Sequence, residues 1–150
     1  MIKLDFRISE NSQASVKSFS DPKAIYEEMK EYSRADREIF FLIFLNPRNQ
    51  ILKIEPNSIG SVDGSSVYPK EIFRSALLAN ASSIICVHNH PSGDPTASQA
   101  DKELTKQLVG CGLMLDIKIL DHVILGSDGK FFSFADDGLI DDYEIMAIRR

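Results

Sequence analysis

The chain has 150 residues, 43% of them hydrophobic and 26% charged, which is ordinary for a globular protein in water. That length suffices for one domain with a hydrophobic core, and we expect residues 1–150 to form a single domain. No apolar run approaches the roughly 18 residues that a membrane span needs. The formal net charge of −5 and the scattered lysines and arginines give no support for nucleic-acid binding, which usually requires a basic face.

The start of the chain and the cysteines point to a cellular compartment. Residues 2–8 alternate and are charged, so they predict at most a short strand and contain no signal-peptide core. We therefore expect a cytoplasmic protein. Cys86 and Cys111 form no CxxC pair, and in a reducing compartment both are expected to be free thiols.

The first part of the chain predicts one helix and two strands. Asp21, followed by a proline, is a helix-start signal, and the apolar spacing behind it predicts a helix that ends near Ser33. The unbroken apolar run Ile39–Leu45 is typical of a strand covered on both faces. Gln50–Ile59 is expected to return antiparallel to it, before a loop rich in glycine and serine at residues 60–66.

The middle of the chain predicts a helix, a buried strand and a second helix. Pro69 begins the first of these helices, and Ser83–His88 has the apolar composition of a second buried strand. Ser98 is expected to cap the next helix, which the glycines Gly110 and Gly112 would end.

The last part of the chain predicts mostly strand. Met114–Leu125 is expected to be a long strand, and the turn signal at residues 127–129 leads into a hairpin partner over Lys130–Phe134. The residues from Leu139 onward are compatible with a helix or with an acidic tail. Together the elements predict an α/β fold with a mixed sheet.

Two histidines follow directly from the buried strand. His88 and His90 are one residue apart, so their side chains lie on the same side if the chain is still extended there. Asp101 follows at the start of the predicted helix. Nitrogen and oxygen ligands of this kind suit zinc, and three protein ligands leave a fourth position for water, as in catalytic zinc sites.

Asp101 has a second explanation. Ser98-Gln99-Ala100-Asp101 matches a capping box, in which the acidic residue hydrogen-bonds back to the cap. Capping alone would account for this spacing. The two roles are compatible, because a helix start held by Ser98 also determines where Asp101 points.

A hydrolytic zinc site also needs a base that is not itself a ligand. Asp94 and Glu103 are nearest in the sequence, but Glu103 lies two positions from Asp101 and faces away on a helix. Glu38 begins the strand Ile39–Leu45, which is expected in the same sheet as the histidines. It is therefore the favoured base, although a strand-start glutamate can simply be exposed.

These residues resemble a known family. Glu38, then His88-x-His90, seven residues, Ser98, two residues and Asp101 are similar to the JAMM pattern of the JAB/MPN metallopeptidases. The run from His88 to Pro95 (HNHPSGDP), with a Leu-Asp-His triplet further on, looks like the RadC branch. The resemblance covers about residues 35–139.

The resemblance implies a fold, a cofactor and a reaction. It implies a three-layer α/β/α sandwich similar to the cytidine-deaminase-like fold, with Zn²⁺ held by His88, His90, Asp101 and a water. It also implies Glu38 as the general acid/base and Ser98 as a hydrogen-bond donor near the tetrahedral intermediate. The expected substrate is a peptide or an isopeptide-linked protein.

Two other functions follow from the family. Many MPN-type domains have lost the metal and serve as interaction modules, although every motif residue is present here. RadC proteins commonly carry an N-terminal helix-hairpin-helix region, and the 37 residues before Glu38 show no such pattern, so a role as a DNA-repair accessory protein has less support. A deaminase is disfavoured because the chain lacks the HxE and PCxxC signatures.

Three further residues have an open role. Asp121 or His122 is expected either to orient a ligand histidine from behind or to make a polar contact inside the sheet. Cys86 shares the face of His88 in a regular strand, where it is expected to be a small buried hydrophobe rather than a ligand or nucleophile.

Overall fold

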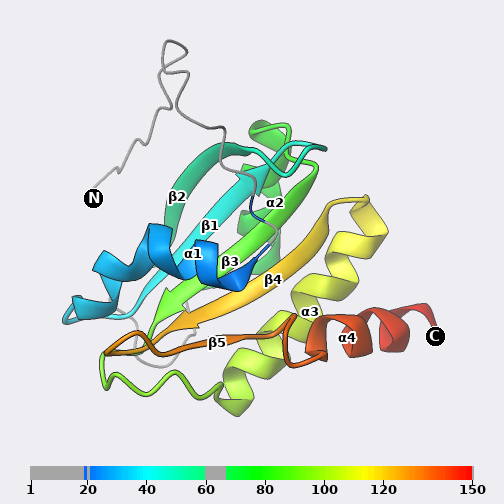
Figure 1. Cartoon of the computed structure of the whole chain (residues 1–150). Coiled ribbons are helices and arrows are strands. Elements are labelled where there is room, and N and C mark those ends of the chain that lie inside the picture. Colours follow the sequence, from blue (N-terminus) through cyan, green and yellow to red (C-terminus); the bar gives the residue numbers. More distant parts are fainter. Residues whose placement is uncertain (1–18, 20, 60–66, 150) are drawn as a thin grey trace, which may run out of the picture.

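The computed structural model describes residues 19, 21–59 and 67–149, which form helices packed on both faces of a sheet (Figure 1). The helices are α1 (Pro22–Met29), the 3-10 helix η1 (Lys30–Arg34), α2 (Pro69–Leu78), α3 (Gln99–Leu115) and α4 (Leu139–Ile148). The strands are β1 (Ile39–Leu45), β2 (Ile51–Ile59), β3 (Ser83–Asn89), β4 (Lys118–Leu125) and β5 (Phe131–Ser133). The strand predicted over residues 2–8 and the loop at residues 60–66 lie outside the described residues.

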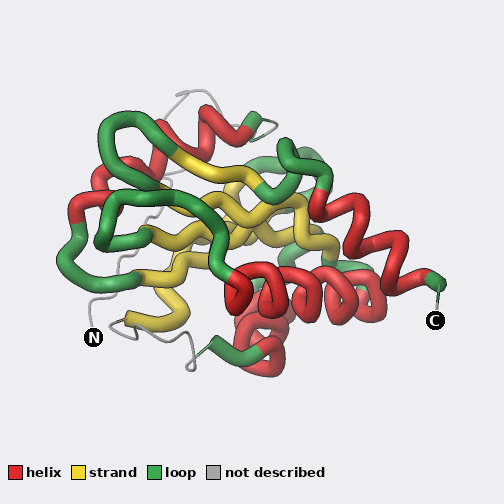
Figure 2. The backbone as a smooth tube through the Cα atoms, turned by 90° about the horizontal axis from the view of Figure 1, so that it is seen from below, coloured by secondary structure: helices red, strands yellow, loops and turns green. Residues whose placement is uncertain are grey.

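The five strands form one mixed sheet in the order β2-β1-β3-β4-β5. β3 is central, pairs antiparallel with β1 and parallel with β4, and α3 makes the crossover between the two parallel strands. In Figure 2 the sheet lies between helices on its two sides. The predicted α/β fold with three layers and a mixed sheet is therefore confirmed.

Each face of the sheet has its own hydrophobic core. One core lies under α2, α3 and α4 and includes Ile84 and Cys86 of β3. The other lies under α1 and includes Ile85 and Val87 of the same strand. Because side chains alternate along a strand, a strand buried on both faces needs an unbroken apolar run. No helix in the described ranges is long and apolar enough to cross a membrane.

Most predicted element boundaries are confirmed. The Asp21 side chain accepts a hydrogen bond from the Lys23 backbone N–H at 3.0 Å and caps α1. β1 has the bounds predicted from its apolar run, and β2 returns antiparallel to it. The residues from Leu139 onward form α4, which decides between the helix and the acidic tail.

The predicted end of α3 is wrong. The helix continues through Gly110 and Gly112 to Leu115, and β4 begins only at Lys118, later than the predicted strand start at Met114. Asp116 caps the C-terminal end of α3, and its backbone takes the left-handed conformation (φ 57°). Gly112 serves packing instead, because a Cβ there would lie 2.4 Å from the Ile117 carbonyl oxygen.

The two glycines therefore predict opposite effects of the same substitution. Gly110→Ala adds a Cβ that meets no atom within 4 Å. Because glycine loses more backbone entropy than alanine when it enters a helix, the substitution should raise the free energy of unfolding by about 0.5–1 kcal/mol. Gly112→Ala forces the chain at Ile117 to move and should lower it by about 1–3 kcal/mol. Chemical denaturation of both variants measures this, and equal effects would contradict the packing role of Gly112.

Candidate metal centre

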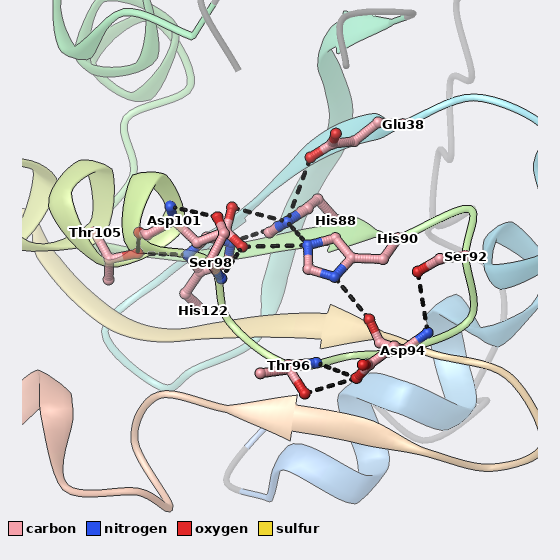
Figure 3. A network of polar contacts seen from close by, with 10 residues as sticks. All are labelled: Glu38, His88, His90, Ser92, Asp94, Thr96, Ser98, Asp101, Thr105 and His122. Atoms are coloured by element: carbon pink, nitrogen blue, oxygen red, sulfur yellow. Dashed lines mark hydrogen bonds and ion pairs between the residues drawn. The ribbon is translucent and has the colours of Figure 1, made fainter. Parts of the chain in front are cut away.

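Four side chains from different parts of the chain converge at one end of the sheet (Figure 3). Glu38 directly precedes β1, His88 lies near the end of β3, His90 follows that strand, and Asp101 lies in the first turn of α3. One donor atom from each lies within 4.8 Å of the others, so the group has the composition and spacing to hold a metal ion. These are the predicted ligands together with the predicted base.

The predicted ligands form a tight triangle. His88 Nε2 lies 3.1 Å from His90 Nε2 and 3.3 Å from Asp101 Oδ1, and His90 Nε2 lies 3.2 Å from Asp101 Oδ2. Glu38 Oε1 is 3.5 Å from His88 Nε2 and thus lies at the side of the triangle. The His88 side chain is 1% exposed, whereas those of Glu38 and His90 are 23% and 18% exposed, so the group is buried at His88 and reaches solvent at Glu38 and His90.

Burial and pairing shift the proton affinities of these groups. Burial alone would raise the pKa of Asp101, but its contacts with His88 and His90 outweigh burial and hold that pKa well below the usual range. Burial raises the pKa of Glu38, against the opposing effect of the nearby histidines. The hydrogen bond to Asp101 raises the pKa of His90. Asp101 is therefore a carboxylate at neutral pH, the state in which it can bind a cation.

The loop after β3 orients His90. His90 Nδ1 lies 2.8 Å from the Asp94 carbonyl oxygen, which can only accept, so Nδ1 carries the hydrogen and Nε2 faces the cluster. The Asp94 carboxylate accepts hydrogen bonds from the Thr96 backbone N–H and hydroxyl at 2.9 and 2.6 Å. That carboxylate closes the loop, whereas Glu38 is the carboxylate beside the predicted ligands.

Ser98 and Asp101 form the predicted capping box. The Ser98 hydroxyl oxygen accepts from the Asp101 backbone N–H at 3.0 Å, and Asp101 Oδ2 accepts from the Ser98 backbone N–H at 2.9 Å. Asp101 contacts both histidines at the same time, so capping and membership of the cluster coexist. Because Ser98 Oγ is the acceptor in its capping bond, that bond leaves its hydroxyl hydrogen available for another partner.

Asn89 positions Glu38, a role that the sequence analysis missed. Its side-chain oxygen accepts from the Ile39 backbone N–H at 2.8 Å, and its amide nitrogen donates to the Arg37 carbonyl at 2.8 Å. The two bonds hold the backbone on both sides of Glu38. The available signal was a polar residue between two histidines at the end of a buried strand, since a buried amide there needs partners.

Replacing Asn89 should lower the stability of the fold. Asn89→Ala leaves the Ile39 N–H and the Arg37 carbonyl without these partners, so we expect the free energy of unfolding to fall by about 1–3 kcal/mol. Chemical denaturation of the metal-free protein measures the loss. Unchanged stability would show that other contacts hold the start of β1.

Only one residue of the Asp121-His122 pair touches the cluster. His122 Nε2 lies 2.7 Å from His88 Nδ1. Asp121 instead accepts hydrogen bonds from Ser133 and Ala135 at the end of β5. Cys86 is fully buried in the core, and burial raises the pKa of its thiol, which favours the expected role as a small hydrophobe.

Two hollows lie near the helices. A small cavity beside the cluster is lined by Glu38 and Asp101 together with apolar side chains that include Phe40, Val67 and Leu104. A larger groove of about 680 Å³ between α3 and α4 shares no residue with the cluster. Of these two hollows, only the small cavity adjoins the cluster.

The mixed sheet and the Glu, His, His and Asp cluster have the form expected of a JAB-type domain. The profile of one family, described as a RadC-like JAB domain, matches residues 19–139. That match covers most of the chain, which belongs to this family.

Several relatives share this region. A UPF0758 protein of Caldanaerobacter subterraneus subsp. tengcongensis is 44% identical over 141 residues, which are 93% of this chain and 60% of the relative. A UPF0758 protein of Methanosarcina mazei is 46% identical over 125 residues, 83% of this chain and 54% of the relative. One of Methanosarcina acetivorans is 48% identical over 120 residues, 79% and 52% of the two chains. The chain therefore spans little more than half the length of these relatives.

Proposed function

We propose that the chain is a zinc-dependent hydrolase that cleaves peptide or isopeptide bonds. The observation that carries this proposal is the convergence of His88, His90 and Asp101 on one point, with the carboxylate of Glu38 beside them. Three neutral or anionic N/O donors with a separate carboxylate form the donor set of a catalytic rather than a structural zinc site.

The distances between the donor atoms support zinc. Zinc binds nitrogen and oxygen ligands at about 2.0–2.2 Å in tetrahedral geometry, which separates neighbouring ligand atoms by about 3.3–3.6 Å. The separations of 3.1, 3.2 and 3.3 Å among His88, His90 and Asp101 are close to that spacing. These three residues would hold the ion.

Glu38 would transfer the proton, and Ser98 would stabilise the negative charge that develops on the carbonyl oxygen. When bound, zinc lowers the pKa of a coordinated water toward about 7 and polarises the substrate carbonyl. Glu38, with a pKa raised by burial, accepts the proton of the attacking water and then donates it to the leaving amine. The free hydroxyl hydrogen of Ser98 donates a hydrogen bond to the oxyanion, a contact that is worth about 2.7–4 kcal/mol in other enzymes.

The small cavity beside Glu38 has room for a small group of the substrate. Its apolar walls at Phe40, Val67 and Leu104 suit an uncharged group next to the scissile amide. A peptide or an isopeptide-linked protein has such an amide.

Metal content tests the ligand set. We expect about one zinc per chain in the purified protein, and His88→Ala should lose it because two ligands bind zinc far more weakly than three. Elemental analysis measures the zinc, with Cys86→Ala as the control that should retain it. Full occupancy in His88→Ala would remove His88 from the ligand set.

Glu38→Gln separates metal binding from catalysis. The amide keeps the shape of the side chain but cannot accept the proton, so hydrolysis should fall by about 10²–10⁴-fold while the zinc stays. Digestion of a synthetic peptide library and of lysine ε-amide substrates, read by mass spectrometry, measures activity. Glu103→Gln, on the same helix as Asp101, is the matched control and should remain active.

Two results would contradict the proposed role of Glu38. An active Glu38→Gln variant would show that another group takes the proton. A Glu38→Gln variant that loses zinc would make Glu38 a ligand and leave the site without the open position that hydrolysis needs.

A further inference from the structure

His122 is a fully buried histidine that lies directly behind His88. His122 is 0% exposed, and its Nε2 lies 2.7 Å from His88 Nδ1, whereas His88 contacts the cluster through its other ring nitrogen, Nε2 (Figure 3). The Phe134 ring stacks on His122 at 4.9 Å and 9°, and the Phe40 ring meets it edge-on at 5.4 Å. These rings keep water from the contact between the two histidines.

A chain of hydrogen bonds runs from His88 back to α3. His122 Nδ1 lies 2.6 Å from the Thr105 hydroxyl, and that hydroxyl donates to the Asp101 carbonyl oxygen at 2.7 Å. Asp101 also contributes its carboxylate to the cluster. The chain therefore connects the ligand carried by β3 with the ligand carried by α3.

The donor and the acceptor of each hydrogen bond in this chain follow from the bond between the Thr105 hydroxyl and the Asp101 carbonyl oxygen. A carbonyl oxygen has no hydrogen, so the Thr105 hydroxyl must donate to Asp101 and can accept only from His122 Nδ1–H. His122 Nε2 then carries a lone pair and accepts from His88 Nδ1–H. The remaining lone pair of His88 is on Nε2, which faces the cluster, the arrangement that metal binding requires.

A register shift in β4 turns His122 toward α3. Ile119 packs on the α3 side of the sheet and Leu120 on the α1 side, as alternation requires. Continued alternation from Ile119 would place Val123 on the α3 side and Ile124 on the α1 side, but each lies on the other side. The strand therefore contains one extra residue between Leu120 and Val123, because one extra residue moves all later side chains to the other face.

The strand pairing locates this extra residue. Ile84 of β3 pairs with Ile119, but the next residue, Ile85, pairs with Asp121. Asp121 Oδ1 accepts from the backbone N–H of His122 at 2.7 Å, which satisfies that amide at the shift. Without the shift His122 would face α1 and could not reach His88.

We propose that His122, supported by Thr105, is a positioning residue for the metal centre that holds the His88 ring with Nε2 toward the ion. This inference rests on the proposed function and assigns no proton transfer to His122. Second-sphere hydrogen bonds of this kind contribute about 10–100-fold to metal affinity in other proteins.

The zinc dissociation constant, measured with zinc alone against a chromophoric chelator, tests the proposal. His122→Phe keeps a planar ring for the Phe134 stack but removes the acceptor, so it should bind zinc about 10–100-fold more weakly. His122→Gln, whose amide oxygen can accept from His88, should recover most of the affinity. Thr105→Val should bind more weakly than Thr105→Ser, which keeps the hydroxyl.

A matched control separates positioning from general stability. Ser133→Ala removes another buried hydroxyl, which donates to Asp121 at 2.7 Å, without touching the chain from His88 to Asp101. It should lower the unfolding temperature of the metal-free protein but leave the zinc affinity unchanged. In NMR spectra of the zinc-loaded protein, the His88 Nδ1–H signal should be protected from water exchange in the wild type and lost in His122→Phe.

The outcomes are distinguishable. If the wild type binds zinc and both His122→Phe and Thr105→Val bind it equally well, the positioning role is overturned and the proposed function stands. The same holds if Ser133→Ala weakens zinc binding as much as His122→Phe. If His122→Phe does not fold, equal affinities of Thr105→Val and Thr105→Ser overturn the role. A wild type that takes up no zinc overturns both proposals.

Discussion

The whole site depends on the central position of β3 in the sheet. Its neighbour β1 begins beside the end of β3 because the two strands are antiparallel, and this places Glu38 next to His88. Its other neighbour, β4, runs parallel and brings His122 behind the same histidine. A strand with hydrophobic cores on both faces cannot slide without moving apolar side chains out of one core, so the pairing is strongly specified.

Polar side chains around the cluster are each held by a second contact. His88 is held by His122, His90 by the Asp94 carbonyl, Asp101 by the Ser98 backbone, and the segment of Glu38 by Asn89. A buried polar group without a partner is costly, and a group with two partners has little freedom to turn. The four donor atoms therefore converge because the structure around them leaves each side chain few alternatives.

α3 links the site to the rest of the fold. Its first turn carries Asp101, where the positive end of the helix dipole also favours a carboxylate. Its body packs against the sheet and carries Thr105, which reaches His122. At its far end Gly112 allows the close approach of Ile117, from which the chain enters β4. One helix thus supplies a member of the cluster, part of its support and the crossover between the parallel strands.

The spacing of residues close in the sequence was enough to predict several strands, one helix cap and two members of the cluster. The apolar runs of β1 and β3, the cap of α3 and the HxH pair could all be predicted from neighbouring residues, because each depends on alternation or on bonds within a few positions. The end of α3 could not, since Gly112 is explained by a contact with Ile117 rather than by helix propensity.

Tertiary structure alone decided which distant residues meet. The sequence placed Glu38 only in the same sheet as the histidines, and its contact with His88 follows from the pairing of β1 with β3. The face of His122 depends on a one-residue shift in β4 that interrupts alternation, so a periodic pattern assigns it to the wrong side. The candidate ligands could thus be predicted from local sequence, whereas the contacts that support them depend on strand order and register, which only the packing of the whole chain determines.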